Sequence, residues 1–244
     1  MADAATGDRG GWLDQLHPEL RASLSAKKDP TYGISQYVAT EGAILGVPVP
    51  EIRRLVDSLH RRHRGLTIDD ASRLLDRCCD ERVREEILFA TFLLAKFRRQ
   101  FDVPLWGAVD RWIEGVDNWE TCDQLATNIA GELVARHRAL VDDLVEWAGS
   151  SNRWRRRFAV AATTALNQKG RSDPEATFRV CAPLMADPEP IVQKAVSWTI
   201  REVCKQNEPA AFAFLQRAQA TAHPRILREA STKLAPAHQQ LLRP

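Results

Sequence analysis

The sequence predicts an all-α protein, on three observations: helical spacing of apolar residues, regularly placed helix breakers and the lack of strand patterns. The stretch 52–59 places its four apolar residues at the i, i+3, i+4 and i+7 positions of one helical face. Stretches 83–94 and 140–145 repeat this spacing, and prolines and glycines separate such segments. No run of alternating Val, Ile and Thr between turn residues indicates a sheet.

Repeated segments define the architecture. Each begins with a short polar or proline-containing turn, continues as an amphipathic helix with packed alanines, and follows the last by about 35 residues, which is typical of helical-hairpin arrays. The five segments begin at Asp80, Asp117, Ser151, Asp187 and Ala222. Preceding helices fit at 103–113, 140–148 and 175–185. We predict a right-handed α-solenoid of degenerate HEAT-like helix pairs, a single curved domain over residues 12–244 after a flexible N-terminus at 1–11.

Three aspartates, Asp69, Asp117 and Asp187, lie at predicted helix starts. A carboxylate at such a position accepts hydrogen bonds from the free amides of the first turn. We therefore predict that each of the three is an N-cap.

Composition excludes several classes of protein. With 44% hydrophobic residues the chain can bury a core, and a formal net charge of +2 does not by itself indicate a nucleic-acid binder. The N-terminus lacks the basic and apolar regions of a signal peptide, and the longest apolar run, 87–95, is about half the length of a membrane span. The five scattered cysteines indicate no disulfide framework. We expect a cytoplasmic protein with no membrane partner.

One group of residues raises the question of a metal: His60, His63, Cys78 and Cys79. Adjacent cysteines are poorly placed to bind one ion, and the two pairs lie on separate predicted helices with no turn between the ligands of either pair. Buried thiols and surface histidines are the simpler interpretation. We predict no metal and no cofactor.

Three tryptophans each share a helical face with a charged residue, on three successive repeats. The pairs are Trp119 with Asp123, Trp154 with Arg157, and Trp198 with Arg201. A single pair is well explained by a core tryptophan and a solvated charge. Three pairs on corresponding helices are also consistent with a binding surface, so both interpretations stay open at this point.

Basic residues gather at one predicted helix start, which carries Arg153, Arg155, Arg156 and Arg157. Cations there oppose the helix dipole, whereas a bound phosphate would be favoured by the arginines and the free amides together. Lys194, Arg201 and Lys205 extend the basic stripe. The run of arginines within 53–64 is interpreted instead as an outer, solvated face.

Four stretches, read in order, resemble the AlkD-type bacterial DNA alkylation repair glycosylases. They are 37–55, the Trp-x-x-x-Asp element in 118–123, the arginine-rich 152–157, and the Gln-Lys-Ala-x-x-Trp-x-x-Arg element in 193–202. The resemblance covers about residues 37–236. It departs from the family at Ala39, where a lysine is common, and in the proline-rich stretch 46–50.

The resemblance implies hydrolysis of the N-glycosidic bond of cationic N3- or N7-alkylated purines. It also assigns roles to matching residues: Asp123 is the catalytic carboxylate, and Trp119 and Trp198 contact the deoxyribose of the lesion. The DNA-binding residues would be Tyr37, Trp154, Arg157, Lys194 and Arg201, the two arginines on backbone phosphates. Members of the family lack a pocket for a flipped base, and the resemblance implies the same for this chain.

The sequence therefore predicts a metal-free, monofunctional DNA glycosylase, a monomer acting on alkylated double-stranded DNA in the bacterial cytoplasm, at the nucleoid. We predict no lyase activity, because no lysine lies beside Asp123 as a Schiff-base nucleophile. Base excision repair and self-protection against an alkylating agent are both open as roles. One alternative is a non-catalytic relative that binds DNA structures or a protein partner. Another, a protein-binding scaffold, predicts apolar inner helices in place of Trp/Arg pairs.

Overall fold

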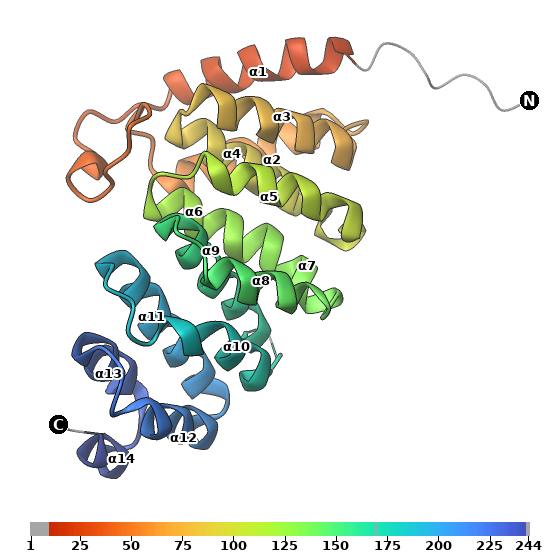
Figure 1. The fold of residues 1–244 in the computed structure, drawn as a ribbon. Helices are drawn as coiled ribbons and strands as arrows, with labels where there is room; N and C mark the ends of the chain where they lie inside the picture. The colour runs from red at the N-terminus through yellow and green to blue at the C-terminus, as the bar shows by residue number, and fades with distance from the viewer. Residues whose placement is uncertain (1–9, 169, 243–244) are drawn as a thin grey trace, which may run out of the picture. The chain divides into compact units, whose positions relative to one another are not determined.

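A computed structural model of the chain describes residues 10–168 and 170–242. Helices make up its regular secondary structure (Figure 1). One isolated bridge pairs Ala43 with Val83. The α-helices are α1 (Gly10–Ser25), α2 (Val49–Arg62), α3 (Ile68–Glu81), α4 (Arg84–Leu94), α5 (Trp106–Glu114), α6 (Trp119–Leu125), α7 (Gly131–Arg136), α8 (Leu140–Ala148), α9 (Arg153–Thr163), α10 (Pro174–Cys181), α11 (Pro190–Gln206), α12 (Glu208–Ala218), α13 (Pro224–Ala230) and α14 (Pro236–Leu241). The prediction of an all-α protein is confirmed.

Shorter helical turns complete the elements. They are the 3₁₀ helices η1 (Ile34–Gln36), η2 (Ala95–Gln100), η3 (Val103–Leu105), η5 (Thr164–Asn167), η6 (Ala182–Leu184) and η7 (Ser231–Lys233), and a π-helix, η4 (Ala126–Ala130). The predicted helices at 103–113 and 175–185 each combine an α-helix with such a turn. The five repeat segments are confirmed by α4, α6, α9, α11 and α13, which begin about 35 residues apart.

The chain divides into two compact units, residues 1–129 and 130–244. In the first unit, α4 is the central helix: every one of its residues is buried, and it packs against α2, α3 and α6. In the second unit, α11 has this place, against α9, α12 and α13. Each unit thus stacks helices that are near neighbours in sequence, which is the packing of an α-solenoid. The single curved domain at 12–244 and its right-handed sense stay predictions.

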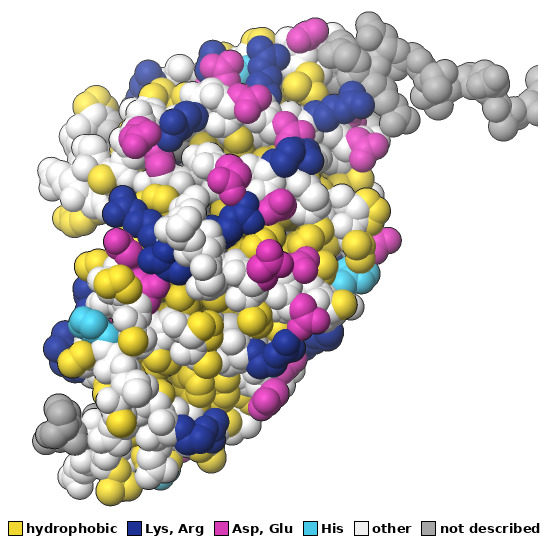
Figure 2. All heavy atoms as spheres, in the orientation of Figure 1, with side chains coloured by type: hydrophobic (Ala, Val, Ile, Leu, Met, Phe, Trp, Pro, Cys, Tyr) yellow, Lys and Arg dark blue, Asp and Glu magenta, His cyan; other side chains and the backbone are white. Residues whose placement is uncertain are grey.

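The predicted flexible N-terminus falls mostly outside the described residues, which begin at Gly10 with α1. No helix within the described ranges combines the length and the apolar character needed to cross a membrane. Figure 2 shows basic and acidic side chains alternating over α1, α3 and α5 of the first unit. This face of the first unit has no single-sign field that would favour a polyanion.

The three predicted N-caps are wrong, and in two of them a neighbouring side chain takes the role. Thr67 caps α3 in a capping box with Asp70, so Asp69 lies inside the first turn. Asn118 caps α6, accepting from the amides of Glu120 and Thr121. Glu189 occupies the N-cap position of α11 without a side-chain cap bond. Asp117 and Asp187 bind other partners, described below.

Candidate active site

Trp119 is the first residue of α6, and its ring is held by a distant loop. Its indole N–H donates to the backbone carbonyl of Tyr37 at 2.9 Å, across 82 residues of sequence. The indole remains 39% exposed and the Tyr37 side chain 74% exposed, which are large values for aromatic residues. Exposed aromatic surface of this kind marks a binding site more often than a core. The first unit therefore presents two adjacent aromatics, one of them fixed in orientation.

Asp117 anchors the loop that carries Tyr37. Its carboxylate accepts from the Thr40 hydroxyl at 2.7 and 2.8 Å, from the Glu41 amide at 2.8 Å and from the Arg82 guanidinium at 3.1 Å. Burial by itself raises the pKa of this carboxyl, but the bonds from Thr40, Asn118 and Glu41 and the charge of Arg82 outweigh it, so the pKa lies below the ordinary value of 3.8. Asp117 thus ties the loop to the start of α6.

Gly42 lets the same loop approach α3 closely. A Cβ atom on Gly42 would lie 2.0 Å from the carbonyl oxygen of Arg82, so only glycine fits without a backbone shift. On either side of this contact, the Ala43 amide donates to the Arg82 carbonyl at 3.0 Å, and the Arg84 amide donates to the Ala43 carbonyl at 2.9 Å. The loop is therefore held by backbone bonds as well as by Asp117.

Asp123, the predicted catalytic carboxylate, lies one helical turn after Trp119 on α6 and is partly buried. The π-helix begins three residues later, and two side chains there donate to backbone carbonyls of the preceding turn. The Thr127 hydroxyl donates to the Asp123 carbonyl at 2.7 Å, and the Asn128 amide donates to the Gln124 carbonyl at 2.8 Å. π-bulges inside helices are frequent at functional sites.

A buried ionic chain fixes α6 against α4, and sequence reasoning missed it. Arg84, 1% exposed, pairs with Glu120 on α6 at 2.6 Å and with Glu85 at 2.8 Å. Glu85, fully buried, in turn accepts from the amides of Leu45, Gly46 and Val47 at 2.8 to 3.2 Å. These charges hold both the turn that carries Asp123 and the end of the aromatic loop.

In the second unit, the arginines at the start of α9 bind protein groups. Arg157, 6% exposed, donates to the carbonyl of Ile191 at 2.5 Å. Arg156 pairs with Asp187 at 2.7 Å and donates to two carbonyls of the turn before α9. The Arg155 guanidinium lies 5.1 Å from the ring centre of Trp147. These contacts with protein groups stabilise the cations at the helix start. The sequence analysis expected a bound phosphate to stabilise them.

Arg153 and Trp154 lie at the exposed end of that cluster. Asn152 caps α9 through the Trp154 amide at 2.9 Å, and the Trp154 ring is partly buried. The Arg153 guanidinium lies 5.6 Å from the centre of this ring and 3.5 Å from a Glu189 oxygen. Of the four arginines, Arg153 is the exposed one.

Trp198 on α11 is oriented by a hydrogen bond of its own. Its indole N–H donates to Glu202 at 3.2 Å, and the same Glu202 oxygen accepts from Lys205 at 2.6 Å. Arg201, partly buried, donates to the carbonyl of Glu229 at 3.0 Å. Lys194, one turn before Trp198, is exposed.

The structure brings the predicted residues together in two groups. Tyr37, Trp119 and Asp123 lie in the first unit, joined by the loop and α6. The remaining five, Trp154, Arg157, Lys194, Trp198 and Arg201, lie in the second unit, on α9 and α11. Their assigned roles stay predictions.

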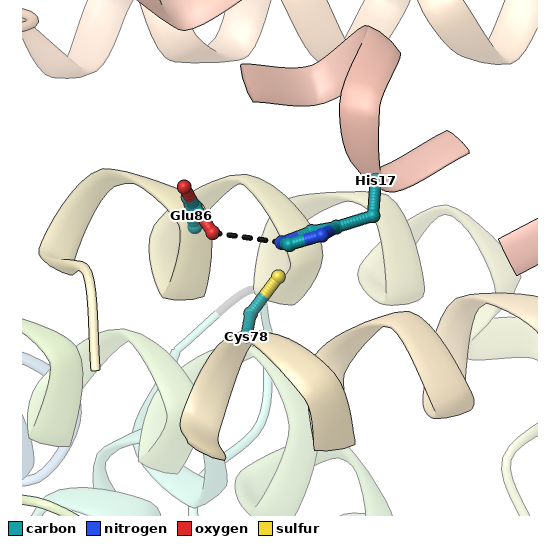
Figure 3. A group of neighbouring side chains, drawn as sticks. All are labelled: His17, Cys78 and Glu86. Carbon is teal, nitrogen blue, oxygen red and sulfur yellow. Dashed lines mark hydrogen bonds and ion pairs between the residues drawn. The ribbon is translucent and has the colours of Figure 1, made fainter. Parts of the chain in front are cut away.

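The four residues considered for a metal are dispersed. His63 bonds to Glu19 at 2.9 Å, and His60 packs edge-on against Phe97. Cys78 lies instead beside His17 and Glu86, with one ligand-type atom of each within 4.8 Å of the others (Figure 3). This trio, His17–Cys78–Glu86, is buried where α1, α3 and α4 meet.

The trio's bonds suit a structural contact. His17 bonds to Glu86 at 2.9 Å, and the second Glu86 oxygen accepts from Arg21 at 2.8 Å. Burial raises the pKa of the Cys78 thiol well above its ordinary value, and the nearby Glu86 charge adds to this effect. We interpret the trio as a polar anchor for α1.

Comparison with known proteins decides the family. The model of the family described as "DNA alkylation repair enzyme" matches residues 19–234. The chain belongs to the DNA alkylation repair enzyme family. No curated protein matches the sequence significantly.

Three solved structures share the fold of this chain. A predicted DNA alkylation repair enzyme from Enterococcus faecalis matches with a TM-score of 0.73 at 20% identity, covering 86% of this chain and 98% of that one. AlkD2 from Streptococcus mutans matches with a TM-score of 0.64 at 16% identity, covering 91% and 99%. The smu.31 protein from Streptococcus mutans UA159 gives a TM-score of 0.56 at 17% identity, covering 77% and 99%. The family's name and these folds support the resemblance drawn from the sequence.

Proposed function

We propose that this protein is a monofunctional DNA glycosylase that hydrolyses the N-glycosidic bond of cationic N3- or N7-alkylated purines in duplex DNA. The observation that carries the proposal is Asp123, a carboxylate one helical turn from an exposed tryptophan whose ring is fixed in orientation. Membership of a DNA alkylation repair family supports DNA as the substrate.

The chemistry needs few groups. An alkylated purine is already cationic, so when the C1′–N bond breaks the base takes the electron pair and leaves neutral. The sugar then carries oxocarbenium charge, which a carboxylate stabilises; water adds at C1′ and releases its proton to that carboxylate or to solvent. In this scheme Asp123 supplies the carboxylate, and no metal or other cofactor is required.

The tryptophans would stabilise the same charge. An indole face near a cationic sugar contributes on the order of 1–2 kcal/mol when water is excluded. Trp119 suits this role because its N–H is engaged by the Tyr37 carbonyl, which leaves the ring face available. Trp198, held through Glu202, is proposed for the corresponding contact from the second unit. The open setting of Trp119 favours action without a base-flipping pocket.

DNA binding completes the proposal. We assign Tyr37, Trp154, Arg157, Lys194 and Arg201 to the DNA interface. Arg157 and Arg201 already bind backbone carbonyls, so their contribution would include placing the helices that follow as well as attracting phosphate. We propose a monomer that acts on chromosomal DNA at the nucleoid of the bacterial cytoplasm.

The test is release of free base from a duplex that contains N7-methylguanine. Wild type should release the base, Asp123→Asn should lose nearly all activity while still binding duplex, and the exposed control Asp80→Asn should match wild type. A bulky N3-alkyladenine duplex is the second substrate. If wild type binds DNA yet releases neither base, the glycosylase proposal fails and the protein is a non-catalytic DNA binder.

A further inference from the structure

We propose that the first unit holds a phosphate subsite for a DNA backbone phosphodiester, between α2, the end of α4 and the π-helix. The subsite is a small cavity, about 170 Å³ in volume. Its charged and polar lining residues are Arg53, Asp57, Lys96, Arg98 and Asn128, with Phe92 as its aromatic wall. This inference rests on the proposed function, because it takes duplex DNA as the ligand.

The charge of the cavity favours an anion. Three cations and a single carboxylate line it, and that carboxylate, Asp57, is already paired with Lys96 at 2.5 Å. Arg53 forms no ion pair with any carboxylate in the described ranges, and the Arg98 guanidinium has no hydrogen-bond or ion-pair partner there. Positive charge is therefore left in excess where the cavity opens.

Arg53 is pre-oriented for such a ligand. Its guanidinium lies 3.8 Å from the centre of the Phe92 ring, and its hydrogen bond to Gln124 is long at 3.4 Å. Burial lowers the pKa of this guanidinium, although the group stays charged at any ordinary pH. A stacked guanidinium with free N–H groups matches the oxygen geometry of a phosphate. Arg53 is exposed, as the sequence predicted for this face, and its guanidinium also stacks on Phe92.

The size and position of the cavity point to a backbone phosphate. Pockets for drug-sized ligands usually measure about 300–1,000 Å³, so this one suits a small anionic group. Gln124, which accepts from both Arg53 and Asn128, directly follows Asp123 in sequence. A phosphate bound here would therefore lie beside the turn that carries the proposed catalytic carboxylate, as one strand of a bound duplex would place it.

The experiment measures binding of an undamaged, fluorescein-labelled duplex by anisotropy over a series of KCl concentrations. Arg53→Gln and Arg98→Gln should weaken binding several-fold and each reduce the slope of log affinity against log salt by about 0.9 or less, the value for one phosphate. Arg53→Lys keeps the charge and should retain most of the slope. The matched control is Arg54→Gln, whose side chain is 70% exposed and pairs with Glu51 on the same helix.

The outcomes separate this inference from the proposed function. Unchanged slopes in Arg53→Gln and Arg98→Gln, with folding confirmed by circular dichroism, overturn the subsite even if base release persists. If the variants reduce the salt slope but wild type releases no base, the subsite is supported and the glycosylase proposal fails. Stabilisation of wild type but not Arg53→Gln by inorganic phosphate, with unchanged duplex slopes, would overturn DNA as the ligand. Failure of wild type to bind duplex overturns both.

Discussion

The indole N–H of Trp119 donates a hydrogen bond to the backbone carbonyl of Tyr37, and this 2.9 Å contact joins the start of α6 to a loop 82 residues earlier. A side chain that bonds a backbone carbonyl holds its ring independently of the side chain at that position. The orientation of Trp119 therefore depends on where the loop lies, and the loop depends on Asp117, Gly42 and Glu85.

Replacing Trp119 tests the aromatic contribution to catalysis. Trp119→Ala removes the ring face and should lower the single-turnover rate of base release by about 5- to 30-fold, equivalent to about 1–2 kcal/mol of lost cation–π stabilisation. Trp119→Phe keeps an aromatic face without the N–H and should give a smaller loss. The control, Trp112→Phe, removes a comparable indole bond, from α5 to Asp76 on α3. Equal rates for all three variants and wild type would contradict the role.

Asp117→Asn should weaken the attachment of the aromatic loop. Loss of a charged acceptor costs about 1–3 kcal/mol of unfolding free energy at neutral pH. Because the pKa of Asp117 in the folded protein is lowered, its stabilisation is complete above pH 3.8 and is lost as the pH falls through the folded value. Thermal unfolding measured across this pH range should show that the difference in stability between wild type and variant becomes smaller below pH 3.8. A gap that stays constant down to acid pH would count against the ionic anchor.

Arg84→Met should strongly destabilise the protein. The substitution leaves Glu85 and Glu120 buried without their cation, and breaking a buried pair in this way costs about 3–5 kcal/mol. Urea unfolding measures the change. Arg73→Met, an exposed arginine on α3, is the control and should change stability by less than about 0.5 kcal/mol. Similar changes in unfolding free energy for the two variants would show that the buried ion pairs contribute little to stability.

Two glycine substitutions should have opposite effects. Gly42→Ala places a methyl group 2.0 Å from the Arg82 carbonyl, so the loop must move and stability should fall. Gly107→Ala adds a methyl group with no atom within 4 Å, in the first turn of α5, and should stabilise by up to about 1 kcal/mol. Melting temperatures of the pair provide the check. In Gly42→Ala, quenching of Trp119 fluorescence should also change; an unaltered spectrum would argue that the loop tolerates the methyl group.

The thiols should resist alkylation while the protein is folded. Burial raises the pKa of Cys181 to about 12, and burial with the Asp76 and Asp80 charges does the same for Cys79. The thiolate is the reactive form, so at neutral pH very little is present. Iodoacetamide labelling followed by mass spectrometry should find the five cysteines modified only after unfolding in urea. Rapid modification of Cys79 under native conditions would contradict the argument.

The helices were predictable from sequence because their apolar spacing is strong. The five repeat segments begin where α4, α6, α9, α11 and α13 begin, and the helix predicted at 140–148 coincides with α8. The N-caps were not, because a stretch such as Asp117–Asn118 offers two side chains of equal capping ability. Which of them turns toward the helix is decided by distant partners, here Thr40 and Arg82.

The candidate site was predictable only where residues stand in a motif. Trp119, Asp123, Trp198 and Arg201 come from such motifs, and the structure shows hydrogen-bond partners for the side chains of Trp119, Trp198 and Arg201. Arg84, Glu85 and Glu120 carried no signal, because charged residues in the first turn of a helix usually indicate that the turn is solvated. Their burial follows from the position of α4 at the centre of its unit, which periodicity does not reveal.

The buried cysteines have a consequence for a protein that works while alkylating agents are present. Such agents attack any accessible soft nucleophile, and a thiolate on the surface would be consumed before a purine in DNA. With four of its five thiols buried and Cys79 held in the protonated form, the folded protein offers these agents few targets of its own. Under the proposed function, the protein would resist alkylation of its own thiols for as long as it stays folded.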